Sequence, residues 1–241
     1  MMALALSIGQ YYGFDSLVEF FILIISLLIS YNSYKIYKVI KEKNYSLFSL
    51  AFLSISVAFV FKIVSNITLL NVIKIEKGSL ILSAIHELNE LQAINFFSFL
   101  LYKIFLIVGF LTLFLIINKT LNKESMMLYL YFNIITVIFS IYYNFIFHLT
   151  IAIILFSLTI HFYKNYSAQK NKHKLLVFLA FLIMFLSHLF FTMIERNPIF
   201  YITGEMFILV GFGLLLLNQR DTKNGKENKT RSYKRYTRSV K

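Results

Sequence analysis

The chain has 241 residues, of which 59% are hydrophobic and 15% are charged, and its formal net charge is +13. A soluble domain carries about 25% charged residues, so this composition argues against a soluble globular protein. The chain has no cysteine, which excludes disulfides, thiolate metal sites and cysteine nucleophiles.

The first apolar run covers residues 15–37. No Lys or Arg occurs in residues 1–34, whereas Lys35 and Lys38 follow directly. A cleavable signal peptide has basic residues before its apolar core, which is the opposite order. We therefore expect an uncleaved first span with its N-terminus outside the cell.

Six more apolar runs follow along the chain. They cover residues 46–70, 94–117, 125–142, 145–163, 175–194 and 199–217. About 20 apolar residues are needed to cross the roughly 30 Å hydrocarbon core as a helix, and backbone polar groups in lipid must be paired internally. The sequence thus predicts an all-α membrane protein with a seven-transmembrane-helix bundle. Only three residues, Tyr142 to Asn144, separate the fourth and fifth spans, so their connection must be very tight.

The basic residues predict the orientation of this bundle. Nineteen of the 24 Lys and Arg residues fall in the segments predicted to be cytoplasmic, and three fall in the outer segments. The remaining two, Lys62 and Lys103, lie inside spans. Because cytoplasmic loops carry the excess of basic residues, this distribution predicts a multi-pass protein of the cell membrane, N-out and C-in.

The segment before the third span has a different pattern. Within residues 80–95, apolar residues recur at helical spacing, with His86, Glu87 and Glu90 on the other side. This pattern fits an amphipathic helix on the outer surface, and it equally fits an outward extension of the third span. Further along, Pro198 marks a short outer turn into the last span, because proline suits the first turn of a helix.

Ionisable residues in the spans are the first candidates for a functional site, because they are costly in lipid and usually face the bundle interior. With the predicted orientation, they all map to the outer half of the membrane. The sequence therefore predicts a polar cavity that opens outward and binds a small ligand or an ion. Its predicted lining residues are Lys62, Glu87, Glu90, Lys103, His148, His188 and Glu205. Glu205, about two turns into the last span, is the leading candidate.

Two interpretations remain open for each intramembrane lysine. Lys62 lies near the outer end of its span, so it either extends to the lipid headgroups or lines the cavity. Lys103 lies deeper, so we expect a buried acidic partner such as Glu205 or Glu87, serving either structure or ligand capture.

The histidines are interpreted first as hydrogen-bonding residues. His148 and His188 favour hydrogen bonds between helices over metal coordination. His86 and Glu90 are four residues apart and would share a helix face, but zinc sites need three or four ligands. No metal and no cofactor is therefore predicted.

The sequence lacks the residues that several known membrane-protein chemistries require. The last span has no Lys for a retinal Schiff base, His188 has no histidine one turn away for a zinc hydrolase, and no phosphate-binding loop is present. The position of the ionisable residues in one half of the membrane favours a non-enzymatic binding or sensing module. An intramembrane enzyme acting on lipid, with His188 or His148 as base and Glu205 orienting it, is an alternative.

Two further alternatives are a transporter or channel and a structural subunit of a membrane complex. A transporter should have polar residues that continue toward the cytoplasm. The inner halves of the spans offer little beyond Asn133, Ser140 and His161. A structural subunit should tolerate apolar replacement of the candidate residues.

Residues 218–241 form a basic tail with nine Lys or Arg residues. Its low apolar content predicts a disordered cytoplasmic segment. Basic residues next to a span contact anionic lipids, so lipid is the expected partner. A membrane-protein partner is a further expectation, and nucleic acid is not favoured.

Parts of the first, second and last spans resemble small archaeal seven-span membrane proteins of uncharacterised activity, and also seven-helix sensor modules that lack their signalling domain. The segments that carry the resemblance are Phe14-Asp15, Tyr31–Lys38, Leu50–Leu53, Phe61–Ile63, Gly204-Glu205 and Gly211–Leu217. The resemblance implies a seven-helix membrane fold and no particular activity.

Overall fold

The computed structural model describes residues 12–78, 83–118, 123–194 and 196–239. Within these ranges, the side chains of residues 12–13, 72–78, 83–89, 123–126, 128–129 and 220–239 lie outside the description. The described part is helical throughout apart from its turns. Its helices are α2 (Tyr12–Ile40), α3 (Lys43–Gly78), α4 (Ser83–Asn118), α5 (Lys123–Tyr142), α6 (Asn144–Gln169), α7 (Lys172–Thr192) and α8 (Ile199–Ser239).

Six of these helices are long and apolar enough to cross a membrane. The chain is therefore a multi-pass helical membrane protein, and its surface shows why. Large apolar side chains such as Phe97 and Ile153 point outward and are more than 60% exposed, which suits lipid rather than water. In α5 the qualifying apolar stretch, Leu130–Tyr142, is shorter, so the count of seven spans and their orientation remain predictions.

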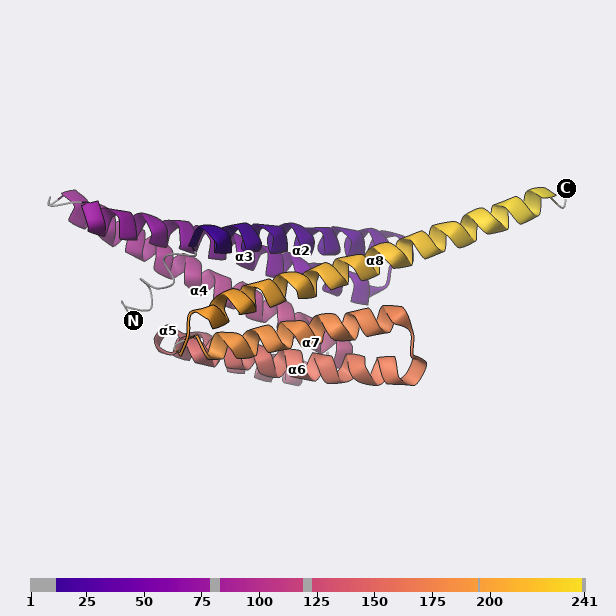
Figure 1. Ribbon diagram of the computed structural model, residues 1–241. Helices are drawn as coiled ribbons and strands as arrows, with labels where there is room; N and C mark the ends of the chain where they lie inside the picture. Colours follow the sequence, from indigo (N-terminus) through magenta and orange to yellow (C-terminus); the bar gives the residue numbers. More distant parts are fainter. Residues whose placement is uncertain (1–11, 79–82, 119–122, 195, 240–241) are drawn as a thin grey trace.

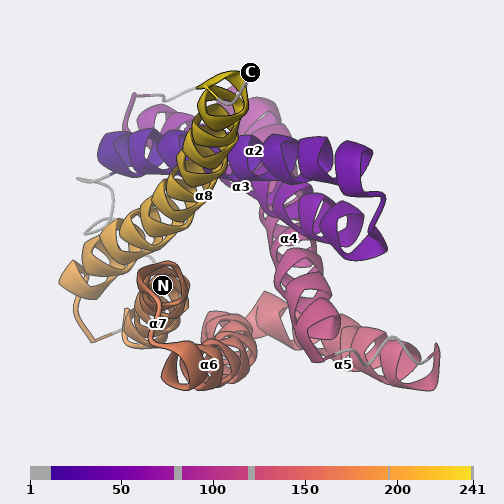
Figure 2. The same cartoon turned by 90° about the vertical axis from the view of Figure 1, so that its right-hand side faces the viewer.

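The helices pack as a ring (Figure 2). Going around it, α2 packs on α3, α3 on α4, α4 on α6, α6 on α7, α7 on α8, and α8 on α2. Helix α5 lies outside this ring, against α4 and α6. Figure 1 shows that α6, α7 and α8 run back and forth along one axis, as alternating spans must.

Aromatic side chains fill the centre of the ring. Phe212 of α8 packs edge-to-face on Phe52 and Phe59 of α3, each with a centroid distance of 6.2 Å. Tyr102 of α4 contacts Phe59 at 6.3 Å and Phe147 of α6 at 5.6 Å. These rings prefer such edge-to-face contacts because their electron-rich faces attract the positive ring edges. They join α3, α4, α6 and α8 in one core.

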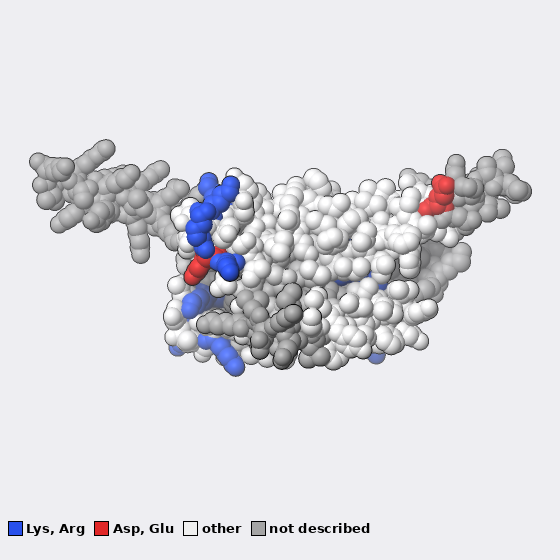
Figure 3. Space-filling model, turned by 180° about the vertical axis from the view of Figure 1, so that it is seen from behind, with Lys and Arg blue, Asp and Glu red and all other residues white. Residues whose placement is uncertain are grey.

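The turns divide the bundle into two ends. The turns after α2 and α6 contain Lys41 and Lys170 in the left-handed conformation, with φ of 60° and 42°. In both turns the amide N–H donates back to a helix carbonyl, of Tyr37 and Tyr166, which closes the helix. We call this end the inner end, following the predicted orientation. Figure 3 shows Lys and Arg side chains gathered there on one face of the molecule, while the middle of that face is almost free of charged side chains.

The outer turns also follow the local sequence. Only Tyr143 separates α5 from α6, which confirms the very tight connection. Before α8, the side chain of Asn197 accepts a hydrogen bond from the Ile199 N–H, so Asn197 and Pro198 begin the helix as predicted. The backbone of α4 starts at Ser83 and continues without a break into the third span, which favours the outward extension over a separate surface helix.

The last helix differs from the expected boundary. We expected the chain to lose regular structure at Asn218, but the backbone of α8 continues as helix to Ser239. The side chains after Gln219 lie outside the description. The interpretation of residues 218–241 as a disordered tail that contacts anionic lipids stays a prediction.

Two glycines of α8 allow a specific test of the packing between α7 and α8. A Cβ added to Gly211 would lie 2.5 Å from Met184 Cγ and 3.1 Å from the Ala180 carbonyl oxygen, whereas one added to Gly213 would meet no atom within 4 Å. Overpacking a tight core costs about 1–3 kcal/mol. We expect Gly211→Ala to lower the free energy of unfolding by about that amount, as measured by thermal unfolding in detergent. Gly213→Ala is the matched control and should be neutral or slightly stabilising, because alanine favours helix by about 1 kcal/mol.

Candidate functional site

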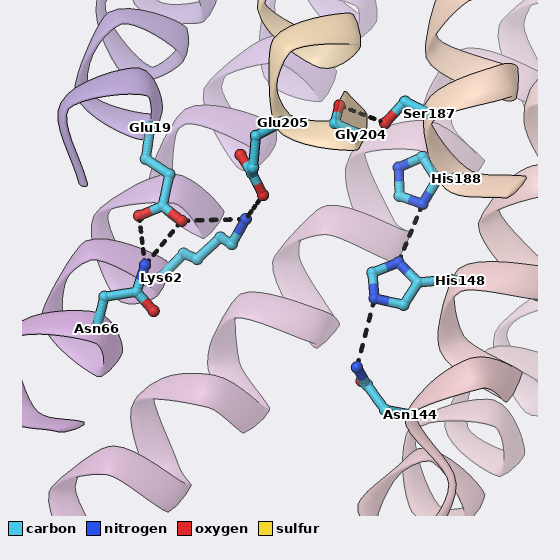
Figure 4. Close-up of polar contacts among 9 residues, drawn as sticks. All are labelled: Glu19, Lys62, Asn66, Asn144, His148, Ser187, His188, Gly204 and Glu205. Atoms are coloured by element: carbon cyan, nitrogen blue, oxygen red, sulfur yellow. Dashed lines mark hydrogen bonds and ion pairs between the residues drawn. The ribbon is translucent and has the colours of Figure 1, made fainter. Parts of the chain in front are cut away.

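Lys62 is the centre of a buried ionic cluster in the outer half of the ring. It lies on α3 and is only 6% exposed. Its ammonium nitrogen is 3.0 Å from Glu19 Oε1 of α2, and it also donates to Glu205 Oε1 of α8 (Figure 4). Three helices are therefore joined by one ammonium group. The interpretation in which Lys62 extends to the lipid headgroups is wrong, because the side chain turns inward to these carboxylates.

Glu19 is fully hydrogen bonded. Asn66 lies one turn after Lys62 on α3, and its amide nitrogen donates to both Glu19 oxygens, at 2.9 and 3.0 Å. Glu19 is completely buried. A buried carboxylate with two amide hydrogen bonds and an ammonium partner is stabilised in its charged form. Glu19 and Lys62 are thus the most completely paired groups of the cluster.

Aromatic rings surround the ammonium group of Lys62. It lies 5.5 Å from the ring centroid of Tyr102 and 5.8 Å from those of Phe59, Phe191 and Tyr201. The electron-rich face of an aromatic ring attracts a cation, and more strongly where water is excluded. These rings come from α3, α4, α7 and α8, so five helices contribute to the surroundings of Lys62 once α2 is included.

The carboxyl groups outnumber the cation. Asp15 lies one turn before Glu19 on α2, is completely buried, and interacts electrostatically with Glu205, Lys62 and Tyr201. Although the Tyr201 hydroxyl approaches Asp15, neither Asp15 oxygen has a hydrogen-bond partner of normal geometry among the described residues, and the same holds for Glu205 Oε2. Buried polar atoms are almost always paired, so three such oxygens in one cluster require an explanation.

The two intramembrane histidines form a second buried group. The Nδ1 atoms of His148 on α6 and His188 on α7 are 3.3 Å apart, and the Asn144 amide nitrogen lies 3.5 Å from His148 Nε2. One Nδ1 must carry the proton and the other must accept it. This confirms the prediction of a hydrogen bond between helices. Phe191 packs against both imidazoles, tilted against His148 and edge-to-face with His188, and it also contacts the Lys62 ammonium, so it separates this pair from the cluster.

Lys103 has a different partner from the acidic one that we predicted. Its ammonium group donates to the Ser140 carbonyl oxygen of α5 at 2.7 Å, and it lies over the rings of Phe99 and Phe147, at 4.4 and 5.5 Å. The predicted ion pair with Glu205 is wrong. The last carbonyls of a helix lack partners within that helix and carry partial negative charge. Lys103 therefore caps the C-terminal end of α5 and ties this peripheral helix to the ring.

Of the three polar residues singled out at the start of the third segment, Glu90 alone has a described side chain. The side chains of His86 and Glu87 lie outside the described residues. Glu90 is exposed on α4. Among the described side chains, no group of three His, Cys, Asp or Glu residues is arranged to hold a metal ion. The predicted ligand-binding roles of Glu87 and Glu90 stay predictions.

Asp15, Glu19 and Asn66 were missing from the predicted site. Their spacing carried the missing signal, because Asp15 and Glu19 are four residues apart, as are Lys62 and Asn66. Residues four apart share one face of a helix, so two polar faces on neighbouring spans indicate a shared site.

The cluster is closed to water in this structure, whereas the sequence predicts a cavity open to the outer side. The side chains of Asp15, Glu19 and Glu205 have no exposed surface. On the inner side of these carboxyl groups, a space lined by six apolar side chains and His188 has no room for a water molecule. The site as it stands admits only a very small ligand.

Polar side chains continue from the cluster toward the inner end, contrary to our expectation. Ser30 of α2 and Ser49 of α3 exchange hydrogen bonds through their hydroxyl groups and carbonyl oxygens, at 2.8–3.1 Å. Near the inner end, Gln219 of α8 contacts Asn32 at 3.3 Å and Ser33 at 3.4 Å. These contacts add polar groups to the inner half of the seam between α2, α3 and α8, on the inner side of its apolar core.

Comparisons of this chain with protein-family models, with curated proteins and with solved structures found no match, so its function is inferred from the geometry of the site.

Proposed function

We propose that this protein is a non-enzymatic seven-span membrane module that binds a small ion from the outer side, at the cluster of Lys62, Glu19, Asp15 and Glu205. The observation that carries the proposal is the set of three buried carboxylate oxygens without partners. Burying an unpaired charged group costs roughly several kcal/mol of folding free energy. A bound cationic species would pair with these oxygens and so stabilise the folded state. The closed packing favours an ion over an organic ligand.

The contacts of Glu205 favour binding over catalysis. An intramembrane enzyme of the kind considered would use Glu205 to orient His148 or His188. Instead, Glu205 pairs with Lys62, and the two histidines pair with each other. Orientation of a catalytic base needs a direct hydrogen bond, which this arrangement does not provide.

The distribution of charge supports the orientation within the proposal. Most of the described basic side chains gather at the inner turns (Figure 3), as expected for the cytoplasmic side of a multi-pass protein. The N-terminus is then outside the cell, and the basic tail meets the anionic inner leaflet. The ionic cluster lies in the outer half, so ions reach it from the extracellular side.

A transporter is the second candidate, and the polar contacts in the inner half of the bundle are the observation that favours it. The hydroxyl and amide groups of Ser30, Ser49 and Gln219 lie between the cluster and the inner end, where a transported proton or ion would pass. The same hydroxyl groups also serve as ordinary contacts between helices. Uptake into sealed liposomes distinguishes a transporter from a binding module.

Ion-dependent stability tests the proposed function. A ligand at 100 times its Kd stabilises a protein by about 2.7 kcal/mol, or roughly 5–10 °C in Tm for a chain of this size. We would follow thermal unfolding in detergent while varying H⁺, Li⁺, Na⁺, K⁺ and Ca²⁺ one at a time. We expect one of these ions to raise the Tm of the wild type and not that of Glu205→Gln.

Glu42→Gln is the matched control, because Glu42 is exposed in the turn between α2 and α3, and it should respond as the wild type does. The chain has no cysteine, so Arg196→Cys and Glu42→Cys report the two sides of the membrane through an impermeant maleimide. Equal responses of the wild type and Glu205→Gln to all five ions would overturn the proposed function.

A further inference from the structure

The unpartnered oxygens of the cluster belong to two helices. Both oxygens of Asp15 are on α2, and Glu205 Oε2 is on α8. Figure 4 shows that this second oxygen of Glu205 points away from Lys62. Three carboxylates and one ammonium leave two negative charges without compensation in a space with no exposed surface.

We propose that Asp15 and Glu205 share one bound proton, so that the ligand of this site is a proton exchanged with the outer side. This inference rests on the proposed function and names its ligand. The proton would reside on Asp15 and be donated to Glu205 Oε2. The other Asp15 oxygen would accept from the Tyr201 hydroxyl that approaches it.

One proton at this position accounts for all three unpartnered oxygens. Glu205 Oε1 keeps its ion pair with Lys62, and Glu19 keeps its bonds to Lys62 and Asn66. The uncompensated charge of the cluster falls from two to one. Two carboxyl groups that share a site cannot both ionise without strong repulsion, so they retain a proton between them.

Metal cations fit these residues less well. Calcium takes about six to eight oxygen ligands, and magnesium keeps several of its waters. The cluster offers three free carboxylate oxygens and one hydroxyl, and the buried carboxyl groups leave no surface that a water molecule could touch. A proton needs only one donor and one acceptor, and it needs no additional volume.

The groups around Asp15 and Glu205 determine how loss of the proton affects the packing of the helices. The titratable groups that face the pair are Glu19 on α2, Lys62 on α3, Tyr102 on α4 and Tyr201 on α8. His188 and His148 lie beyond Phe191. Without the proton, Asp15 and Glu205 repel each other across the contact between α2 and α8. Proton release therefore weakens this helix contact, which makes the site a pH sensor.

The sign of the pH dependence follows from this assignment. The folded protein holds a proton that an exposed carboxyl group would lose at a pH of about 4. Stability is therefore lost as the pH rises from that value to the pH at which the pair releases its proton. The equilibrium constant for folding should fall about tenfold per pH unit across this window.

Infrared spectroscopy of the full-length protein in nanodiscs, titrated with pH, tests the proposal directly. The wild type should show the carbonyl stretch of a protonated carboxylic acid at neutral pH, and this band should disappear at higher pH. Asp15→Asn should abolish the band and remove the pH dependence of stability, because its amide donates to Glu205 permanently. Glu42→Gln, which lies outside the cluster, should keep the band.

The outcomes separate this inference from the proposed function. If the band is absent at every pH and Na⁺ or Li⁺ stabilises the wild type but not Glu205→Gln, the ligand is a metal cation. The proton assignment is then wrong and the proposed function stands. If the band is absent and no ion stabilises the wild type, both proposals are wrong. A band that persists in Asp15→Asn and disappears in Glu19→Gln would also overturn the assignment.

Discussion

Lys62→Ala is expected to lower the free energy of unfolding by about 3–5 kcal/mol, the cost of removing one partner from a buried ion pair. The substitution leaves Glu19 and Glu205 without their cation, and both are completely buried. It also removes the group that attracts four aromatic rings. Thermal unfolding in detergent should show a drop in Tm of roughly 6 °C or more for a chain of this size.

The matched control is Lys43→Ala, because Lys43 is exposed at the start of the same helix. It should change stability by less than about 0.5 kcal/mol. In the double variant Lys62→Ala with Glu205→Ala, the loss should be smaller than the sum of the single losses, because one uncompensated charge is gone. Equal Tm values for Lys62→Ala and Lys43→Ala would contradict the central position of Lys62.

Lys103→Met should release α5 and leave the ring intact. Methionine retains most of the length of lysine but cannot donate to the Ser140 carbonyl oxygen. Losing a buried hydrogen bond from a charged donor costs about 1.5–3 kcal/mol. We expect backbone amides of α5 to exchange with deuterium roughly tenfold faster or more, because a difference of about 1.4 kcal/mol corresponds to a factor of ten.

Lys164→Met is the control for this second prediction, because Lys164 is exposed on α6. Its exchange pattern should match that of the wild type. The readout is specific to α5, since the contacts of α2, α3 and α8 do not involve Lys103. Faster exchange spread evenly over all helices in Lys103→Met would instead assign Lys103 to the general core.

Hydropathy and charge predicted the spans and the depth of Lys62 and Glu205, but they did not predict the contact between these residues. The depth of a side chain in the membrane follows from its position along a span. The side of the helix from which it projects does not follow from the sequence, because lipid is as apolar as a protein core and both faces of a span carry similar residues. Ile22 is buried and Phe21 is exposed, although both are apolar neighbours on α2. The sequence pattern therefore did not predict the order of the helices, which brings α8 beside α2.

Lys103 illustrates a different difficulty. A buried lysine in lipid suggests an acidic partner, but its actual partner is a backbone carbonyl at the end of α5. Every helix end carries such carbonyls, so their position becomes informative only when the helix boundary is known. The α5 boundary depends on a turn of one residue, Tyr143. Polar residues at a spacing of four, as in Asp15 and Glu19, are the more readable signal.

The contact between α2 and α8 has a mechanical consequence. These two helices are joined near the outer end through Lys62 and near the inner end through Gln219, Asn32 and Ser33. Glu205 and Gln219 are separated by about 21 Å along one unbroken helix, at 1.5 Å per residue. Helix α8 therefore moves as one rigid body between these two contacts. A shift at the ionic cluster would pivot its far end and move the basic segment without bending any loop.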